Sequence, residues 1–258
     1  MSTGLPADLR AAVTVLARVP RLLVALDFDG TLAPHVDDPD AARPLPESQA
    51  AIDRLVSLPR TRVALISGRA IDSLERVASP APEILLVGSH GLEQRFDEPY
   101  GGLQLTDDER ALRAGLEAVL LRVAERYEGV WLEEKPAGFV IHTRLVSDEL
   151  ATQVQEQARV DTASLSGLGV KSGHAVLEFA VRVATKGDGI RRLRDYVTPD
   201  AILFAGDDVT DEDAIAELEP RDLGIKVGPG HTRAGFRIGG PAEVALVLAE
   251  LASLRAGA

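Results

Sequence analysis

Asp27-Phe28-Asp29-Gly30-Thr31-Leu32 directly follows the apolar run 22–26, and this stretch decides the fold of the chain. A short apolar run that ends in acidic residues and glycine is typical of a strand buried on both faces of a parallel sheet. Beyond such a strand, the Asp27 carboxylate and the Asp29 main-chain carbonyl can reach one divalent cation, while the Asp29 side chain stays free for proton transfer. Gly30 permits a sharp turn that points amides at an anion, and Thr31 adds a hydroxyl. The stretch predicts a site with a nucleophile and an acid, although an ordinary acidic turn has the same composition.

Phosphate monoester hydrolysis is a reaction that needs both groups. It is among the slowest biological hydrolyses, and enzymes accelerate it by up to roughly 10²¹-fold. A carboxylate approaches an anionic phosphate only where positive charge intervenes. Mg²⁺, a hard cation that is held by few protein oxygens and several waters, supplies that charge, so we expect Mg²⁺ as the cofactor.

Composition places broad limits on the function. The chain has 258 residues, of which 45% are hydrophobic and 26% are charged, which is typical of a globular protein with a large core. The formal charge of -12 argues against binding to nucleic acid or to an anionic membrane surface. The chain has no cysteine, so disulfides and thiol catalysis are excluded. Residues 1–21 lack the apolar core of a signal peptide, and no run of 18 apolar residues occurs. We therefore expect a cytoplasmic protein. We also expect a monomer.

The order of the expected elements indicates an α/β fold. Short apolar runs predict strands at 22–26, 63–66, 84–87 and 201–205. Segments with helical spacing predict helices at 46–58, 71–78 and 186–196. This alternation predicts a doubly wound, mainly parallel, Rossmann-like sheet. In such sheets ligands bind beyond the carboxyl ends of the strands, where the polar residues of four loops would converge.

Residues 103–181 break the alternation. We expect a helix at 107–127, strands at 130–134 and 138–143, a helix at 148–159, and strands at 169–171 and 175–179. This order predicts a small antiparallel α+β domain inserted into the larger one as a cap. The core domain would then comprise residues 1–102 and 182–258, with short hinges near 96–102 and 181–185.

Three further motifs complete the expected site. Ser67-Gly68-Arg69 follows a strand and precedes a helix, where a hydroxyl and amides can hold a phosphate oxygen, although a serine at such a position, taken alone, is more often a helix N-cap. Lys186 begins a helix against the preference of the helix dipole, which indicates that it serves an anion. The stretch 206–212 places four acids after an apolar strand. Without a metal ion, Asp207 and Asp208 would repel Asp27 in a shared crevice.

Together, Asp27-x-Asp29-Gly30-Thr31, Ser67, Lys186 and Gly206-Asp207-Asp208-x-x-Asp211 resemble the four ordered motifs of the haloacid dehalogenase-like phosphohydrolases. The resemblance implies a phosphoaspartate mechanism with Asp27 as nucleophile and Asp29 as general acid and base. It implies that Ser67 and Lys186 hold the phosphoryl group, with Gly30, Thr31, Gly68 and Arg69 around it. Mg²⁺ would bind Asp27, the Asp29 carbonyl and Asp207, and Asp208 and Asp211 would support it.

Within this superfamily, the chain resembles the trehalose-6-phosphate phosphatases. The similarity lies in the Ser67 and Asp207 motifs and in Gly88-Ser89-His90-Gly91-Leu92-Glu93, which adds His90 to the expected substrate site. In the inserted domain, the resemblance implies that polar residues hold the sugar, namely Lys135, His142, Arg144 and Glu178. Alternating charges on the exposed face of a half-buried sheet would give the same pattern. Glu178 is the exception, because it lies in the apolar stretch 175–180 and needs a partner.

The resemblance therefore favours hydrolysis of trehalose 6-phosphate, with a small-molecule sugar phosphate as the partner. Two alternatives stay open. One is a phosphatase or phosphomutase that acts on another sugar phosphate, such as sucrose phosphate, glycosyl-phosphoglycerate or a hexose phosphate. The other is a non-catalytic sugar-phosphate sensor, against which the full set of Asp27, Asp29, Lys186 and Asp207 argues.

Overall fold

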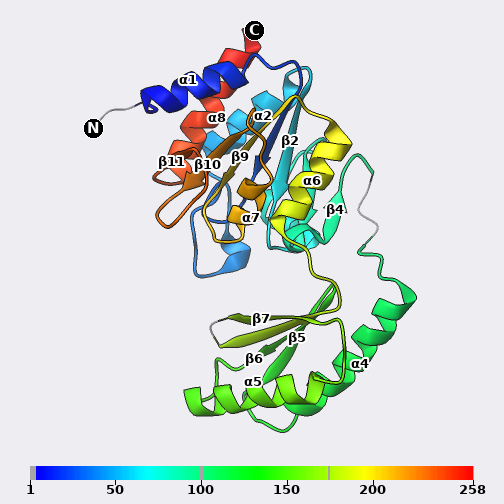
Figure 1. Ribbon diagram of the computed structural model, residues 1–258. Helices are drawn as coiled ribbons and strands as arrows, with labels where there is room; N and C mark the ends of the chain where they lie inside the picture. Colours follow the sequence, from blue (N-terminus) through cyan, green and yellow to red (C-terminus); the bar gives the residue numbers. More distant parts are fainter. Residues whose placement is uncertain (1–3, 99–101, 174, 258) are drawn as a thin grey trace. The chain divides into compact units, whose positions relative to one another are not determined.

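The computed structural model describes residues 4–98, 102–173 and 175–257, and the chain divides into two units (Figure 1). One unit comprises Met1–Gly101 and Ala184–Ala258, and the other comprises Gly102–Val183. Each unit has a sheet and a hydrophobic core of its own. In the part of the chain that is described, no helix combines the length and the apolar character needed to cross a membrane.

The larger unit is built on a seven-stranded sheet with the order β11-β10-β9-β1-β2-β3-β4. Its strands are β1 (Leu22–Leu26), β2 (Thr61–Ile66), β3 (Leu85–Gly88), β4 (Glu93–Arg95), β9 (Ala201–Gly206), β10 (Leu223–Val227) and β11 (Phe236–Ile238). All neighbours are parallel except β3 and β4. The predicted mainly parallel sheet is thus confirmed. Strand order reverses around β1, which pairs with β2 on one side and β9 on the other. A crevice forms at such a switch point.

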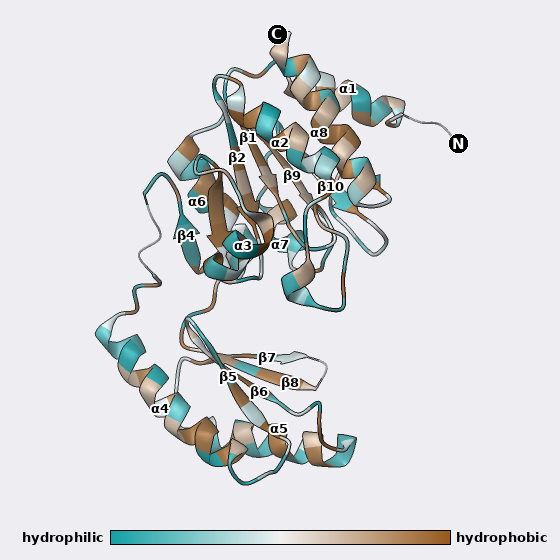
Figure 2. Ribbon diagram, turned by 180° about the vertical axis from the view of Figure 1, so that it is seen from behind, coloured by the Kyte–Doolittle hydropathy of each residue, from teal (hydrophilic) through white to brown (hydrophobic). Residues whose placement is uncertain are grey.

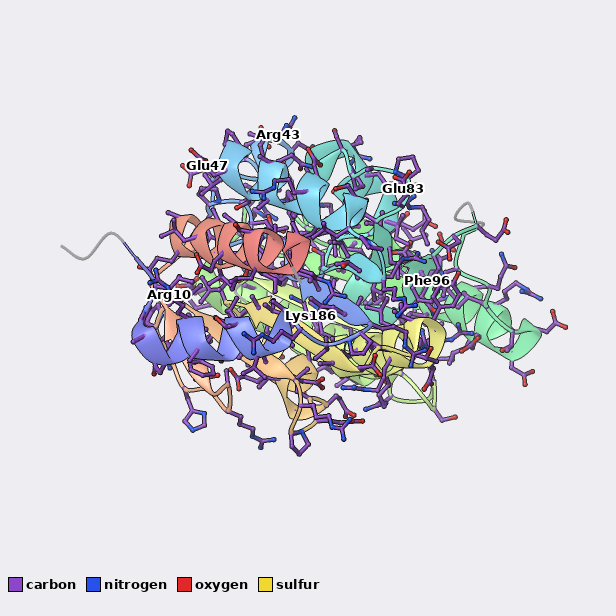
Figure 3. The ribbon with its side chains drawn as sticks, turned by 90° about the horizontal axis from the view of Figure 1, so that it is seen from above. Arg10, Arg43, Glu47, Glu83, Phe96 and Lys186 are labelled. Carbon is purple, nitrogen blue, oxygen red and sulfur yellow. The ribbon has the colours of Figure 1, made fainter. Side chains whose placement is uncertain are left out.

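Helices cover both faces of this sheet. They are α1 (Ala7–Leu16), α2 (Pro46–Ser57), α3 (Ile71–Ala78), α6 (Lys186–Val197), α7 (Asp211–Ala216) and α8 (Pro241–Ala256), with single 3₁₀ turns at Pro39–Ala41 and Ser89–Gly91. Side chains alternate along β1, so that Leu22, Val24 and Leu26 pack with α1, α2, α3 and α8, while Leu23 and Ala25 pack with α6 and α7. Figure 3 shows α2 and α8 on one side of the sheet and α6 on the other. The central strands are hydrophobic along their length, as expected of strands covered on both faces (Figure 2).

The smaller unit has a four-stranded antiparallel sheet with the order β5-β6-β8-β7. Its strands are β5 (Trp131–Lys135), β6 (Gly138–His142), β7 (Gly169–Gly173) and β8 (Val176–Ala180), and its helices are α4 (Asp107–Ala124) and α5 (Asp148–Thr162). One sheet face packs on the two helices, around Phe139, Ile141, Leu177 and Phe179. The predicted order of elements is confirmed, and their ends differ by at most three residues from those expected.

Arg255 near the end of α8 holds three segments of the larger unit together. Its guanidinium donates to the main-chain carbonyls of Ala17, Val19, Pro20 and Arg60, and its Nε donates to the Thr61 hydroxyl at 2.6 Å. Burial lowers the pKa of Arg255. The five hydrogen bonds connect α8 to the segment before β1 and to the start of β2.

We expect Arg255→Met to lower the free energy of unfolding by about 2–4 kcal/mol, because hydrogen bonds from a charged group contribute about 1.5–3 kcal/mol each and are not additive. Urea unfolding followed by circular dichroism would measure the change. Arg10→Met is the matched control, since the ion pair that the Arg10 side chain of α1 forms with Glu250 of α8 is long, at 3.6 Å, and Arg10 is largely exposed. Equal losses in both variants would contradict the role given to Arg255.

Candidate functional site

Asp27 lies directly beyond β1 and is only 3% exposed. Its amide donates to the Ala205 carbonyl of β9 at 3.0 Å, which ties it to the switch point of the sheet. The chain then turns tightly, because the Phe28 carbonyl accepts from the amides of Leu32 and Ala33, both at 2.9 Å. Gly30 lies within this turn at a φ of 81°, and a Cβ built on it would lie 2.1 Å from Asp207 Oδ2. Only glycine fits between this turn and Asp207.

Lys186 bridges two buried carboxylates. It is the first residue of α6, is 3% exposed, and places its Nζ 2.6 Å from Asp27 Oδ1 and 2.6 Å from Asp211 Oδ1. Figure 3 labels it in the larger unit. Thr185 and Asp188 form a capping box at the start of α6, so Asp188 satisfies the preference for an acid that Lys186 does not meet. The anions that Lys186 contacts in this structure are the two aspartates.

The cluster holds more acid than base. Desolvation raises the pKa of Asp27 well above its ordinary value, and Asp211 and Asp207 raise it further, while Lys186 opposes this shift. Desolvation also raises the pKa of Asp211. Burial disfavours the charged form of Lys186, but the facing carboxylates outweigh it and hold the Lys186 pKa above the ordinary lysine range. One ammonium faces three carboxylates, which favours the binding of a further cation.

The donor set fits a hard divalent metal ion. Carboxylate oxygens of Asp27, Asp207 and Asp211 all lie within 4.8 Å of one another. In the described part of the chain, the buried Oδ1 of Asp207 has no hydrogen-bond partner. Asp208 takes no part in this cluster, because it is exposed and its Oδ1 accepts from the Val209 amide at 2.6 Å. Oxygen ligands of this kind suit Mg²⁺.

The predicted phosphate-binding residues lie around the same strand ends. The Ser67 side chain is buried beyond β2, and its Oγ accepts from the Arg69 amide at 3.1 Å. The Thr31 hydroxyl is buried and has no partner among the described residues, as a hydroxyl reserved for a ligand would be. The His90 ring lies against Gly68, where a Cβ would come within 2.6 Å of it.

Arg69 contacts a catalytic candidate directly. Its Nε and Nη2 bind the two Asp29 carboxylate oxygens at 2.6 and 2.7 Å in a bidentate ion pair. Asp29 is the largest cause of the raised pKa of Arg69. Arg69 was expected to contact the substrate, and in this structure its guanidinium orients Asp29.

His35 and Lys226 also lie at this site, and the sequence motifs at the predicted strand ends did not indicate either residue. His35 is 74% exposed in the loop after β1, and its Nε2 lies 2.9 Å from Asp207 Oδ2. Lys226 is buried in β10 and donates to the Asp207 main-chain carbonyl. Neither residue belongs to an acidic or glycine-rich motif at a predicted strand end.

In the smaller unit, the strand register gathers polar side chains on one face of the sheet. Glu133, Val140, Glu178 and Lys171 are cross-strand neighbours on β5, β6, β8 and β7, so their side chains lie on one face. Lys135 and His142 lie two residues along their strands and share that face. The sheet thus brings together Lys135, His142 and Glu178 on the face opposite the helices.

This polar face is organised around Glu133, which sequence reasoning missed. Glu133 forms an ion pair with Lys135 and accepts from His142 Nε2 at 2.7 Å. Burial opposes its charge, but Lys135 and His142 outweigh burial and lower the Glu133 pKa. The His142 ring stacks on Trp131 with centroids 4.6 Å apart, and Arg144 lies 5.3 Å above Trp131 and 3.1 Å from His142 Nδ1. The period of two from Lys135 would have identified Glu133 and Trp131.

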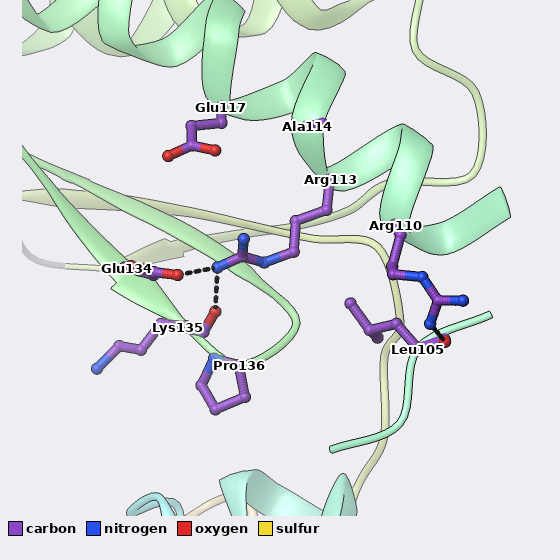
Figure 4. Close-up of a pocket in the computed structure, with 8 residues that line it drawn as sticks. All are labelled: Leu105, Arg110, Arg113, Ala114, Glu117, Glu134, Lys135 and Pro136. Carbon is purple, nitrogen blue, oxygen red and sulfur yellow. Dashed lines mark hydrogen bonds and ion pairs between the residues drawn. The ribbon is translucent and has the colours of Figure 1, made fainter. Parts of the chain in front are cut away.

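A pocket of about 640 Å³ lies between α4 and the turn that joins β5 to β6 (Figure 4). It is lined by Leu105, Arg110, Arg113, Ala114, Glu117, Glu134, Lys135 and Pro136. Arg113 reaches from α4 to the Glu134 carboxylate at 2.6 Å and to the Lys135 carbonyl at 3.1 Å, with its guanidinium 4.5 Å from the Phe139 ring centre. Figure 4 shows the Lys135 side chain directed away from Arg113. Arg113 thereby fixes the main chain from which Lys135 projects.

Comparison with known proteins gives a consistent result. The trehalose-phosphatase family model matches residues 25–237. A bifunctional trehalose-6-phosphate synthase/phosphatase from Thermoproteus tenax is 34% identical over 229 residues, which are 86% of this chain and 31% of that protein. A trehalose-phosphate phosphatase from Mycobacterium marinum is 33% identical over 250 residues, which are 91% of this chain and 62% of that protein. The chain thus spans less than two thirds of these relatives.

Solved structures show the same fold. Trehalose-6-phosphate phosphatase from Aspergillus fumigatus superposes with a TM-score of 0.74 at 27% identity, covering 98% of this chain and 99% of that one. A haloacid dehalogenase-like hydrolase from B. subtilis shares the fold with a TM-score of 0.54 at 16% identity, covering 88% and 98%. Three observations indicate the same family. They are the match of the family model over most of the chain, the relatives above 30% identity, and the motifs at the strand ends. The chain therefore belongs to the trehalose-phosphatase family.

Proposed function

We propose that this protein is a Mg²⁺-dependent phosphatase that converts trehalose 6-phosphate to trehalose and inorganic phosphate through an aspartyl-phosphate on Asp27. The observation that carries the proposal is the buried cluster in which Lys186 bridges Asp27 and Asp211 while Asp207 faces them. Family membership supports phosphatase chemistry. The cytoplasmic location and the monomeric state stay predictions from the sequence.

In the proposed first step, Asp27 attacks phosphorus and the bond from phosphorus to the sugar oxygen breaks. Asp29 leaves its two-bond ion pair with Arg69, carries a proton, and donates it to the leaving sugar oxygen. Ser67, Thr31 and Lys186 hold the phosphoryl oxygens, and Lys186 keeps Asp27 in place. The products of this step are the free sugar and phosphorylated Asp27.

In the second step, water attacks the phosphorus and gives its proton to Asp29. The bond from phosphorus to the Asp27 oxygen breaks, which releases inorganic phosphate and restores both aspartates. Asp27, Asp207 and the Asp29 carbonyl, with Asp211 in support, would hold Mg²⁺, whose positive charge would offset the repulsion between carboxylate and phosphate. The orphaned Asp207 Oδ1 and the excess of acid in the cluster support this ligand set.

A screen of phosphate release tests the proposed reaction. Trehalose 6-phosphate, sucrose 6-phosphate, glucose 6-phosphate and an aryl phosphate would each be incubated with the protein in Mg²⁺ and in EDTA. We expect the highest kcat/KM on trehalose 6-phosphate, and only with Mg²⁺. Preference for another sugar phosphate would refute the substrate, isomer formation without free phosphate would indicate a mutase, and binding without turnover would indicate a sensor.

The polar sheet face of the smaller unit is proposed to hold the sugar. Lys135, His142, Arg144 and Glu178, together with Glu133, supply donors and acceptors for sugar hydroxyls. Trp131 adds an aromatic surface in the same cluster. A disaccharide presents many hydroxyls and apolar ring faces, which suits such a surface.

We expect Glu178→Ala to reduce kcat/KM for trehalose 6-phosphate by roughly 10- to 100-fold, because a hydrogen bond to a charged group contributes about 1.5–3 kcal/mol. Turnover of an aryl phosphate should change less than about twofold. Glu134→Ala is the matched control, because Glu134 lies on the other face of the same sheet and contacts Arg113. Equal losses on both substrates would show that Glu178 does not recognise sugar.

A further inference from the structure

Lys226 is a buried lysine that the proposed mechanism leaves without a role. It lies in β10, is 3% exposed, and is in parallel register with Gly206 of β9. Its ammonium donates to the main-chain carbonyls of Asp207 and, at 3.4 Å, Asp208. Among the described residues it forms no ion pair with a carboxylate.

A lysine at this position is unfavourable for packing alone. Strands covered on both faces are normally filled with apolar side chains, and a buried ammonium loses its hydration. Leu223, Ile225 and Val227 of the same strand follow the apolar pattern and belong to the core. The ammonium is compensated by two carbonyl dipoles and lies beside a loop that carries acidic ligands.

The carbonyls that Lys226 binds belong to the loop that presents Asp207 and Asp211. Asp207 directs its carboxylate to the cluster with Asp27. The Asp208 amide donates to Asp211 Oδ2 at 2.8 Å, while Lys186 binds Asp211 Oδ1. Fixing the Asp207 and Asp208 carbonyls therefore also fixes the amide that orients Asp211.

We propose that Lys226 is a positioning residue for the metal site, which holds the 206–208 main chain so that the Asp207 and Asp211 carboxylates converge on one cation. This inference rests on the proposed Mg²⁺ dependence. Lys226 acts through the loop and touches neither substrate nor metal.

The test compares Lys226→Met and Lys226→Gln with the wild-type protein. Two Mg²⁺ concentrations are measured. One gives half of the full rise in melting temperature when Mg²⁺ is added to the EDTA-treated protein, and the other gives half-maximal aryl phosphate turnover. Loss of a residue that supports metal ligands typically weakens metal affinity by 10–100-fold, so we expect the Met variant to need roughly 10–100 times more Mg²⁺ in both measurements. The Gln variant, which keeps a donor, should need less of an increase.

Arg237→Met is the matched control. Arg237 lies beside Lys226 in the register of β10 and β11, and its guanidinium also binds loop carbonyls, those of Gly228 and Gly230 at 2.5 and 2.6 Å. That loop carries none of the clustered acids. Arg237→Met should change the melting temperature in EDTA while leaving the Mg²⁺ requirement within about twofold of wild type.

Each outcome decides the proposal. A lower melting temperature in EDTA with an unchanged Mg²⁺ requirement in both Lys226 variants would make Lys226 purely structural and overturn the inference, as would failure of both variants to fold. A wild-type protein with no response to Mg²⁺ would refute the proposed metal dependence and this inference together. A normal wild-type response with a weakened response only in the Lys226 variants would support it.

Discussion

Replacing Asp27 with asparagine is expected to reduce kcat for phosphate release by at least about 10³-fold, because the amide keeps the shape of the side chain and removes the proposed nucleophile. Of the neighbouring carboxylates, Asp211 is held by Lys186 and by the Asp208 amide, so it is not free to replace the lost carboxylate. Release of phosphate from an aryl phosphate in saturating Mg²⁺ would measure the loss. This substrate needs no sugar recognition, so the result reports on chemistry.

The same variant separates the chemical role of Asp27 from a structural one. Desolvation and the neighbouring acids raise the pKa of Asp27, so the charged form of Asp27 destabilises the folded state. Asp27→Asn should therefore keep or raise the melting temperature in EDTA. Asp208→Asn is the control, since its exposed carboxylate lies outside the cluster, and it should retain most of the activity. Appreciable turnover by Asp27→Asn, or an equal loss in Asp208→Asn, would refute the nucleophile assignment.

The strand ends were predictable from the sequence because apolar runs mark buried strands and parallel strands end at one edge. Asp27 and Asp207 meet for that reason, whereas Lys186 reaches them from the first residue of α6. The ion pair between Arg69 and Asp29 was not predictable, since it depends on how two loops 40 residues apart place their side chains. β10 also escaped prediction, because Lys226 and Gly224 interrupt its apolar run. Lys226, one of the two residues that interrupt this run, is the residue proposed to position the loop with the metal ligands.

In the inserted unit, the order of elements was predictable and the organisation of the polar face was only partly so. Lys135, His142 and Glu178 were identified from the sequence, and the register of three strands places them together. Glu133 escaped because Glu134, its neighbour, has the same chemistry and lies on the other face. The period of two from Lys135 selects Glu133 for the polar face, and the pairing of Glu133 with Val140 agrees with it.

Lys186→Met is expected to have the largest combined effect on activity and stability. It removes the cation between Asp27 and Asp211, and breaking a buried pair in this way costs about 3–5 kcal/mol of unfolding free energy. We expect that loss in EDTA at pH 8, measured by urea unfolding. Mg²⁺ should restore part of it, because a second cation shares the same carboxylates. Activity should fall by at least about 10²-fold even in saturating Mg²⁺, since the phosphoryl group would also lose the contact proposed for Lys186.

The loss of unfolding free energy in Lys186→Met is expected to depend on pH, and to be larger at high pH. In wild type, the folded state raises the Lys186 pKa, so its stabilisation is complete below the unfolded pKa and is lost only as pH rises through the folded value. In the variant, two buried acids face each other without a cation, which raises their folded pKa values further above the unfolded ones. The folded variant then binds protons more tightly, so its stability rises as pH falls. The gap between variant and wild type should therefore be smaller at pH 5.5 than at pH 8, and Lys171→Met, which removes an exposed lysine of the smaller unit, should show no such trend. A gap that stays constant with pH would mean that Lys186 contributes by packing, and that the excess of negative charge does not govern this site.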